Sequence, residues 1–123
     1  FIQTQCIYNM DKFKEWMKGV VDRGLHEKVK ILAGVTPMKS VGMARYMKKS
    51  VPGMDVPDEI IKRLQGAGKG NAATEGIKMC VEQIQELKEM EGVSGVHIMA
   101  IEWEAAVRPI VEGAGLLPRP QVA

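Results

Sequence analysis

The sequence has no hydrophobic run long enough to cross a membrane, because charged residues interrupt every apolar stretch well before the roughly 20 residues that a spanning helix needs. Aromatic residues are scarce, at 5%, and two cysteines, Cys6 and Cys80, are too few for a disulfide framework or a zinc motif. The formal net charge is only +2, and the basic residues do not gather in one stretch. We therefore expect a cytoplasmic protein with reduced, buried thiols and with no membrane segment, metal or nucleic-acid partner.

Three short apolar runs are the most informative segments that are present. They cover residues 1–8, 29–35 and 95–101, and each is followed by apolar residues at helical spacing. Short buried runs that alternate with long helical stretches are typical of parallel strands joined by crossover helices. The pattern predicts an α/β fold, the C-terminal portion of a (β/α)₈ TIM barrel with three parallel strands. Since the chain begins inside the first strand, we expect residues 1–123 to be one partial barrel domain, its last three βα units.

Helices are expected over residues 9–23, 40–49, 57–65, 71–90 and 103–112. Three of them fall between the second and third strands, and we expect this extra length to shape the mouth of a barrel active site. Proline at position 109 is expected to bend or end the last helix. The glycine-rich segment 66–71 lacks the spacing of a phosphate-binding loop and is interpreted as a helix break.

Polar side chains on otherwise apolar strands are the first candidates for a site. Alternation places Gln3 and Gln5 on one face of the first strand and Thr4 on the other. An unpaired buried amide costs about 1–3 kcal/mol, so these side chains need partners. A glutamine that faces the barrel interior suits a heterocycle with an amide-like edge, and a glutamine paired within the core is an equal alternative. His97 is expected to be a hydrogen-bonded structural histidine, and His26 to lie exposed in a turn.

Glu102 and Trp103 end the third strand, at the edge where barrel sites are built. An acid followed by an indole suits a flat cationic or aromatic ligand. The same pair also suits a helix start beside a packing tryptophan. The two interpretations stay open from the residues alone.

Several segments taken together resemble the methylenetetrahydrofolate reductase family. Each is short, but they keep their order and spacing over nearly the whole chain. In sequence order they are the first strand through Gln5, Asn9–Phe13, Ala33-Gly-Val-Thr-Pro37, Val56-Pro57, Gly95–Glu102 and Gly113-Ala-Gly-Leu-Leu-Pro118.

The resemblance implies the C-terminal part of a flavin-dependent oxidoreductase of one-carbon metabolism, which reduces 5,10-methylenetetrahydrofolate to 5-methyltetrahydrofolate. FAD passes the electrons on from NAD(P)H or another donor. The family's acid catalyst and most of its FAD contacts lie on earlier strands. No catalytic residue and no assigned FAD contact are therefore expected in this chain, which should be inactive alone. The implied partners are the folate substrate and the remaining N-terminal part of the barrel.

The resemblance also assigns substrate-binding residues by position. Gln5 matches the family's glutamine that hydrogen-bonds the pterin. Met47, with Tyr46 beside it, stands where the family has an aromatic residue that covers the folate, and Trp103 stands where it has an arginine near the folate. With Glu102 these are the predicted substrate-binding residues. The departures favour an altered electron donor or a complex with an electron-supplying subunit.

Two other functions remain as alternatives. One is a non-catalytic half-barrel, a structural or regulatory subunit that pairs through its exposed edges. The other is a pterin-dependent methyl-transfer barrel without flavin. In every case a three-stranded parallel sheet leaves two unpaired edges and an uncovered face, so we expect an oligomer or association with the rest of a barrel.

Overall fold

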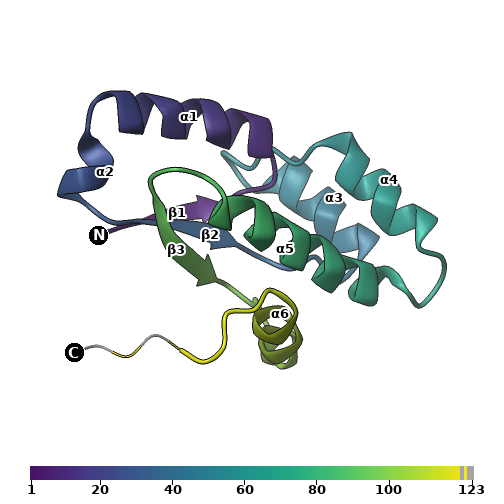
Figure 1. Cartoon of the computed structure of the whole chain (residues 1–123). Coiled ribbons are helices and arrows are strands. Elements are labelled where there is room, and N and C mark those ends of the chain that lie inside the picture. The colour runs from purple at the N-terminus through teal and green to yellow at the C-terminus, as the bar shows by residue number, and fades with distance from the viewer. Residues whose placement is uncertain (120, 122–123) are drawn as a thin grey trace.

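Three parallel strands form one sheet in the order β1-β2-β3 in the computed structural model, which describes residues 1–119 and residue 121 (Figure 1). The strands are β1 (Ile2–Cys6), β2 (Ile31–Val35) and β3 (Val93–Ile98). β2 pairs in parallel with both neighbours. The three predicted strands and their parallel direction are confirmed, and each strand is shorter than the apolar run that predicted it.

Helices connect and follow the strands in the predicted order. They are α1 (Met10–Asp22), α2 (Leu25–Lys28), α3 (Val41–Ser50), α4 (Asp58–Gly66), α5 (Ala72–Lys88), the 3₁₀ helix η1 (Glu104–Ala106) and α6 (Val107–Gly113). Side chains cap two of them: Asn9 accepts a hydrogen bond from the amide of Lys12, and Ser40 accepts one from the amide of Met43. None of the described helices is both long enough and apolar enough to span a bilayer.

Of the two effects expected of Pro109, a bend or an end of the last helix, the second is wrong. Pro109 is the third residue of α6, which continues to Gly113. The first four amides of a helix have no acceptor within it, so a missing N–H costs little at this position.

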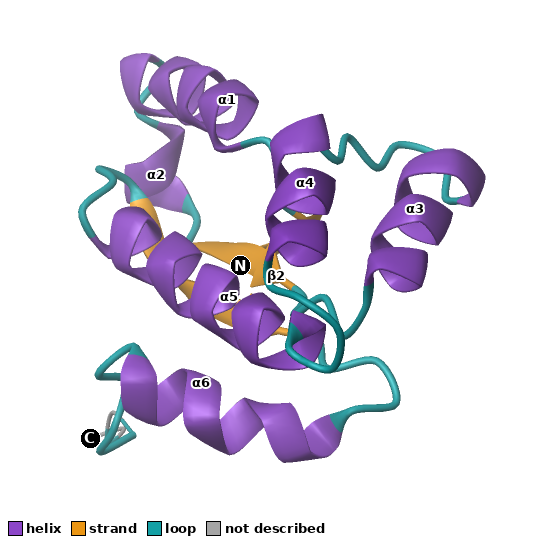
Figure 2. Ribbon diagram, turned by 90° about the vertical axis from the view of Figure 1, so that its right-hand side faces the viewer, coloured by secondary structure: helices purple, strands orange, loops and turns teal. Residues whose placement is uncertain are grey.

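One face of the sheet is covered by α1, α5 and α6 (Figures 1 and 2). Alternate β2 residues face these helices and are buried. The cluster comprises Ile7, Phe13, Met17, Val20, Ile31, Ala33, Val35, Cys80, Ile84, Leu87, Ala106, Ile110 and Ala114. Since full burial of one large aliphatic side chain contributes about 1.5–3 kcal/mol, this cluster is the main source of stability.

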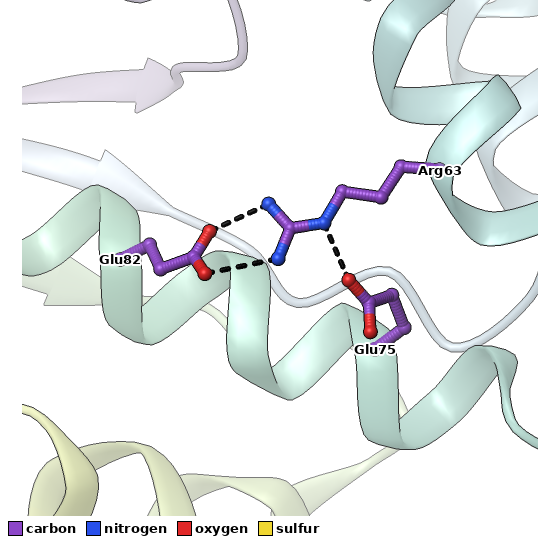
Figure 3. Close-up of polar contacts among 3 residues, drawn as sticks. All are labelled: Arg63, Glu75 and Glu82. Carbon is purple, nitrogen blue, oxygen red and sulfur yellow. Dashed lines mark hydrogen bonds and ion pairs between the residues drawn. The ribbon is translucent and has the colours of Figure 1, made fainter. Parts of the chain in front are cut away.

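A second, smaller cluster holds the inserted helices α3 and α4 beside the ends of β1 and β2. Its buried members are Tyr8, Met38, Ala44, Met47, Val56 and Leu64. Arg63 joins α4 to α5, since its two terminal nitrogens donate to the carboxylate of Glu82 at 2.5 and 2.9 Å and its Nε donates to Glu75 (Figure 3). This planar, two-pronged contact fixes the direction of α4 over α5.

The opposite face of the sheet is not covered in the same way. Gln3 pairs with Leu32 and Gly34 with His97, and none of Gln3, Leu32 and His97 is buried. His97 was expected to be hydrogen-bonded, but its Nδ1 is buried without a partner among the described residues. That result contradicts the expectation at this nitrogen, because none of the described residues places a donor or an acceptor within hydrogen-bonding distance of it.

Two further expectations need correction. His26 is half-buried and not exposed, because α2 occupies the segment predicted as a turn. Cys80 is buried as expected, but Cys6 is only half-buried, because it lies at the end of an edge strand.

Candidate site at the carboxyl ends of the strands

The loops that follow β1 and β2 are tied together by hydrogen bonds at the carboxyl edge of the sheet. The Tyr8 hydroxyl donates to the backbone oxygen of Thr36 at 3.3 Å, and the Cys6 thiol lies 2.9 Å from the Thr36 hydroxyl. Burial, together with the nearby Cys6 thiol, raises the pKa of Tyr8 well above its usual range. Tyr8 therefore stays a neutral donor and keeps the two loops in register.

Gln5 is placed by an unusually close approach of β1 to β2. A Cβ on Gly34 would lie 2.5 Å from the backbone oxygen of Thr4 and 2.6 Å from that of Gln5, so only glycine fits there. The Gly34 amide donates to the Thr4 hydroxyl at 2.9 Å, and the register of the strand pair shifts between Gln3 and Cys6. This irregularity re-aims the end of β1, as bulges next to sites commonly do.

The Gln5 side chain is exposed and points toward the loop between α3 and α4. Its Oε1 lies 3.5 Å from the position that a Cβ on Gly53 would take, and Gly53 has a left-handed φ of +80°. Among the described residues, no hydrogen bond to the Gln5 side chain is formed. The inserted helices therefore bring their connecting loop to the end of β1, next to an amide that is open to a ligand.

A cavity of about 210 Å³ lies beside this loop. It is lined by Cys6, Ile7, Tyr8, Asn9, Lys12, Phe13, Gly53 and Asp55. Asp55 closes one side, since it accepts hydrogen bonds from Lys12 at 2.6 Å and from Asn9 at 3.0 Å. The hydrogen bond from Lys12, followed by that from Asn9, lowers the pKa of Asp55, so this carboxylate is ionised and already paired.

The loops after β2 and β3 also meet at this edge. Lys39 Nζ lies 5.7 Å from the ring centroid of Trp103, whose half-buried indole packs against the first cluster. Glu102 is exposed and has a φ of +50°, an uncommon left-handed conformation for a residue other than glycine. Backbone strain of this kind gathers at functional sites, where the surrounding structure has to hold it.

The predicted site residues occupy two different settings. Gln5, Glu102 and Trp103 lie at the carboxyl edge of the sheet. Tyr46 and Met47 lie on α3, where Tyr46 is 62% exposed and Met47 is 6% exposed within the second cluster. Sequence reasoning passed over Lys39, although its position just after the Pro37 turn at a strand end is a usable signal.

A larger cavity of about 250 Å³ lies between α4, α5 and the start of α1, and no predicted site residue lines it. Its walls include Met10, Met38, Ile60, Met79 and the buried Cys80. Burial raises the pKa of Cys80 to about 12, so the thiol is protonated and unreactive at neutral pH. In the part of the chain that the structure describes, no three His, Cys, Asp or Glu side chains gather to hold a metal ion.

Comparison with known proteins identifies relatives over almost the whole chain. The family model for methylenetetrahydrofolate reductase matches residues 1–115. Methylenetetrahydrofolate reductase 2 of Saccharomyces cerevisiae is 28% identical over 121 residues, which cover 96% of this chain and 20% of that protein. Methylenetetrahydrofolate reductase 1 of Schizosaccharomyces pombe is 28% identical over 120 residues, which cover 95% of this chain and 19% of that protein. The chain thus spans about a fifth of the length of these curated relatives.

Proposed function

Because this chain belongs to the methylenetetrahydrofolate reductase family, we propose that it supplies part of the folate pocket of an enzyme that reduces 5,10-methylenetetrahydrofolate to 5-methyltetrahydrofolate. The three parallel strands and their helices are a portion of the family's (β/α)₈ barrel. We place residues 1–123 in a single barrel domain and the enzyme in the cytoplasm, in keeping with its two free thiols.

The observation that carries the proposal is the open amide of Gln5 at the carboxyl end of β1. A primary amide donates and accepts side by side, which matches the N–C=O edge of a pterin. Barrel enzymes build their sites at this end of the strands. Gln5 therefore binds and orients the pterin, while Gly34 and Gly53 let the surrounding backbone come close enough to frame it.

The other predicted residues take supporting roles in this proposal. Trp103 and Tyr46 offer flat apolar surface to the rings of the folate, and Glu102 offers an acceptor at the end of β3. Met47 has the smallest part, because its side chain is buried within the second cluster. There it anchors α3, the helix that carries Tyr46.

FAD is the cofactor we propose for the intact enzyme, with NAD(P)H or another donor as the electron source. The residues of this chain do not fit the cofactor's diphosphate. The glycine-rich segment 66–70 joins α4 to α5 and does not open a helix after a strand, as a phosphate cradle requires. We therefore assign FAD binding and the acid catalyst to the rest of the protein, without which this chain is inactive. An oligomer or an electron-supplying subunit completes the assembly.

Turnover by the full-length protein tests the proposal. The reduced enzyme is mixed with 5,10-methylenetetrahydrofolate, and reoxidation of the flavin is followed by its absorbance. Loss of the amide in Gln5→Ala should slow reoxidation about tenfold to a hundredfold, the equivalent of 1–3 kcal/mol. Gln85→Ala, which removes an exposed amide on α5, should leave the rate unchanged.

Three outcomes would contradict the proposal. Equal rates for the two variants would remove Gln5 from the pocket. A protein that binds 5-methyltetrahydrofolate but has no flavin absorbance would be a methyl-transfer barrel. A protein that binds neither would be a structural or regulatory half-barrel.

A further inference from the structure

The backbone leaves the sheet at Ile7, two residues after Gln5. The Ile7 N–H donates to the Gly34 carbonyl oxygen at 3.0 Å, and the Ile7 side chain is buried in the first cluster. The carbonyl oxygen of Ile7 accepts a hydrogen bond from the side-chain amide of Gln83 on α5. Among the described residues, no backbone amide donates to that oxygen. Ile7 is therefore held by β2 through its N–H and by α5 through its carbonyl oxygen.

Gln83 is itself held in place. Its side chain is half-buried, and its Nε2 also lies 3.5 Å from the Met10 sulfur, a weak acceptor. The preceding residue, Glu82, is tied to α4 by Arg63 (Figure 3). In the described part of the chain, no other side chain of α5 donates a hydrogen bond to residues 6–9. Gln83 thus connects the α4–α5 pair to the end of β1.

The direction of the Gln5 side chain depends on the backbone that carries it. Gln5 is exposed, and the described residues give its amide no hydrogen-bonding partner. The close approach of Gly34 fixes β1 at Gln5 itself. The hydrogen bond from Gln83 fixes the backbone two residues later. An amide that meets the N–C=O edge of a pterin needs both, because a two-pronged contact weakens steeply when its donor and acceptor turn away.

We propose that Gln83 is a positioning residue for Gln5: it holds the end of β1 so that the Gln5 amide faces the pterin. The inference rests on the proposed function and goes beyond it by naming a residue of α5 that directs the amide without touching the substrate. Loss of the Gln83 donor should therefore slow the reaction of bound substrate more than it weakens substrate binding. It should do so only in an enzyme that still has Gln5.

The test uses the full-length enzyme and its Gln83→Met variant, whose side chain keeps the length of glutamine and lacks the donor. Flavin reoxidation by saturating 5,10-methylenetetrahydrofolate should be about twofold to tenfold slower, as expected for one lost hydrogen bond. The substrate concentration that gives half the maximal rate should stay within about twofold of wild type. Gln85→Met changes an exposed glutamine two residues further along α5 and is the matched control, which should change neither value.

Two readouts separate positioning from a merely structural role. Poor folding lowers the flavin content and the amplitude of reoxidation, but it leaves the rate constant of the folded, flavin-containing fraction unchanged. A double-mutant cycle gives the second readout. In the Gln5→Ala background, Gln83→Met should slow reoxidation by less than about twofold further, because both residues act through one contact with the pterin.

The Gln83→Glu variant turns the donor on and off within one protein, and it decides the question if Gln83→Met loses its flavin. A protonated carboxyl group can donate to the Ile7 oxygen, whereas a carboxylate repels it. Partial burial and the nearby oxygen should raise the pKa of this carboxyl group, so the rate relative to wild type should rise about twofold or more from pH 8 to pH 5. The charged groups that line the adjoining cavity are those of Glu59, Arg63, Glu82 and Glu86. They are present in both proteins, so their titration cancels in the ratio of the two rates.

The outcomes keep the two proposals apart. A wild-type protein without turnover, or a Gln5→Ala variant as fast as wild type, would overturn the proposed function. An active enzyme that needs Gln5 but whose Gln83→Met variant keeps the wild-type rate would overturn the inference and leave the proposed function standing. Independent effects of Gln5→Ala and Gln83→Met, or a Gln83→Glu rate ratio that does not change with pH, would do the same.

Discussion

The two faces of the three-stranded sheet differ in what lies against them. On one face Ile31, Ala33 and Val35 are almost completely excluded from solvent by α1, α5 and α6. On the other, Gln3 is exposed and Leu32 is only half-buried. Successive side chains of β2 therefore alternate between a buried core and a face that is only partly covered.

The difference separates the face of the sheet that stabilises the fold from the face next to which the proposed site lies. The covered face is apolar and closed. The opposite face carries both polar and apolar side chains. Its two outer strands, β1 and β3, each have one unpaired edge, and the exposed amide of Gln5 lies at the carboxyl end of β1. In the barrel proposed above, further strands would cover this face.

The largest expected effect comes from shortening neighbouring β2 side chains on opposite faces. Ile31→Ala should lower the free energy of unfolding by about 2–5 kcal/mol, because the site is fully buried. Leu32→Ala should cost a similar amount in the full-length protein if barrel strands cover that face. Thermal unfolding of both variants measures this, and a near-neutral Leu32→Ala would show that the face is open to solvent.

Two helix glycines, one in close contact with a loop and one exposed, sharpen the comparison at the level of the backbone. A Cβ on Gly76 of α5 would lie 1.7 Å from the backbone oxygen of Met38, so Gly76→Ala should destabilise the protein by about 2 kcal/mol or more. Gly66 at the end of α4 has no neighbour within 4 Å, and Gly66→Ala should stabilise by up to about 1 kcal/mol. Urea denaturation should show that the free energy of unfolding falls for Gly76→Ala and rises for Gly66→Ala. Equal effects would contradict the close contact of α5 with the loop after β2.

A smaller effect on the free energy of unfolding, which depends on pH, is expected for the contact of Arg63 with Glu82. Its hydrogen bonds lower the pKa of Glu82 below the ordinary 4.5. The stabilisation is therefore fully present above that pH and is lost as the pH falls through the lowered value. Because the Glu82 side chain is 47% exposed, solvent screening limits its contribution to about 0.2–1 kcal/mol.

Arg63→Met should remove that part of the acid dependence, as measured by urea denaturation between pH 6 and pH 3. Arg108→Met, which breaks a more exposed pair with Glu112 on α6, should change the profile less. A profile for Arg63→Met parallel to that of wild type would show that the contact in Figure 3 is not formed in solution.

The smallest effect concerns the two thiols. At pH 8 an aromatic disulfide reagent should modify the half-buried Cys6 well before Cys80, whose pKa of about 12 keeps it protonated. Because this pKa is raised, its stabilising contribution is complete below pH 9 and declines only as the pH rises toward 12. Mass spectrometry of the labelled peptides gives the two rates. Faster labelling of Cys80 would contradict its burial between α5 and the sheet.

Local patterns predicted much of the fold. Apolar runs marked the three strands, and apolar residues at helical spacing marked the helices, because both signals depend only on neighbouring residues. The error at Pro109 arose because the last helix was expected to start at residue 103. The α-helix starts at Val107, so Pro109 lies in its first turn, where a proline is tolerated. The helix α2, with four residues after Gly24, is too short for apolar residues to recur at helical spacing.

The candidate site was harder to predict because it depends on packing between loops. The sequence singled out Gln5, Glu102 and Trp103 at strand ends, but no local pattern shows that Lys39 reaches the Trp103 ring. Similarly, helical spacing alone does not distinguish the exposed Tyr46 from the buried Met47. The unpartnered nitrogen of His97 depends on what covers the open face, which no sequence window contains.

Hydrogen exchange of the full-length protein, measured by mass spectrometry, tests most directly whether these strands belong to a closed barrel. β2 is paired on both sides and provides the internal standard, whereas β1 and β3 are the edges of the described sheet. A closed barrel predicts that peptides covering Ile2–Cys6 and Val93–Ile98 exchange as slowly as the peptide covering Ile31–Val35. Fast exchange in β1 and β3 beside a protected β2 would show that the edges are free, and would contradict the barrel and the folate pocket built on it.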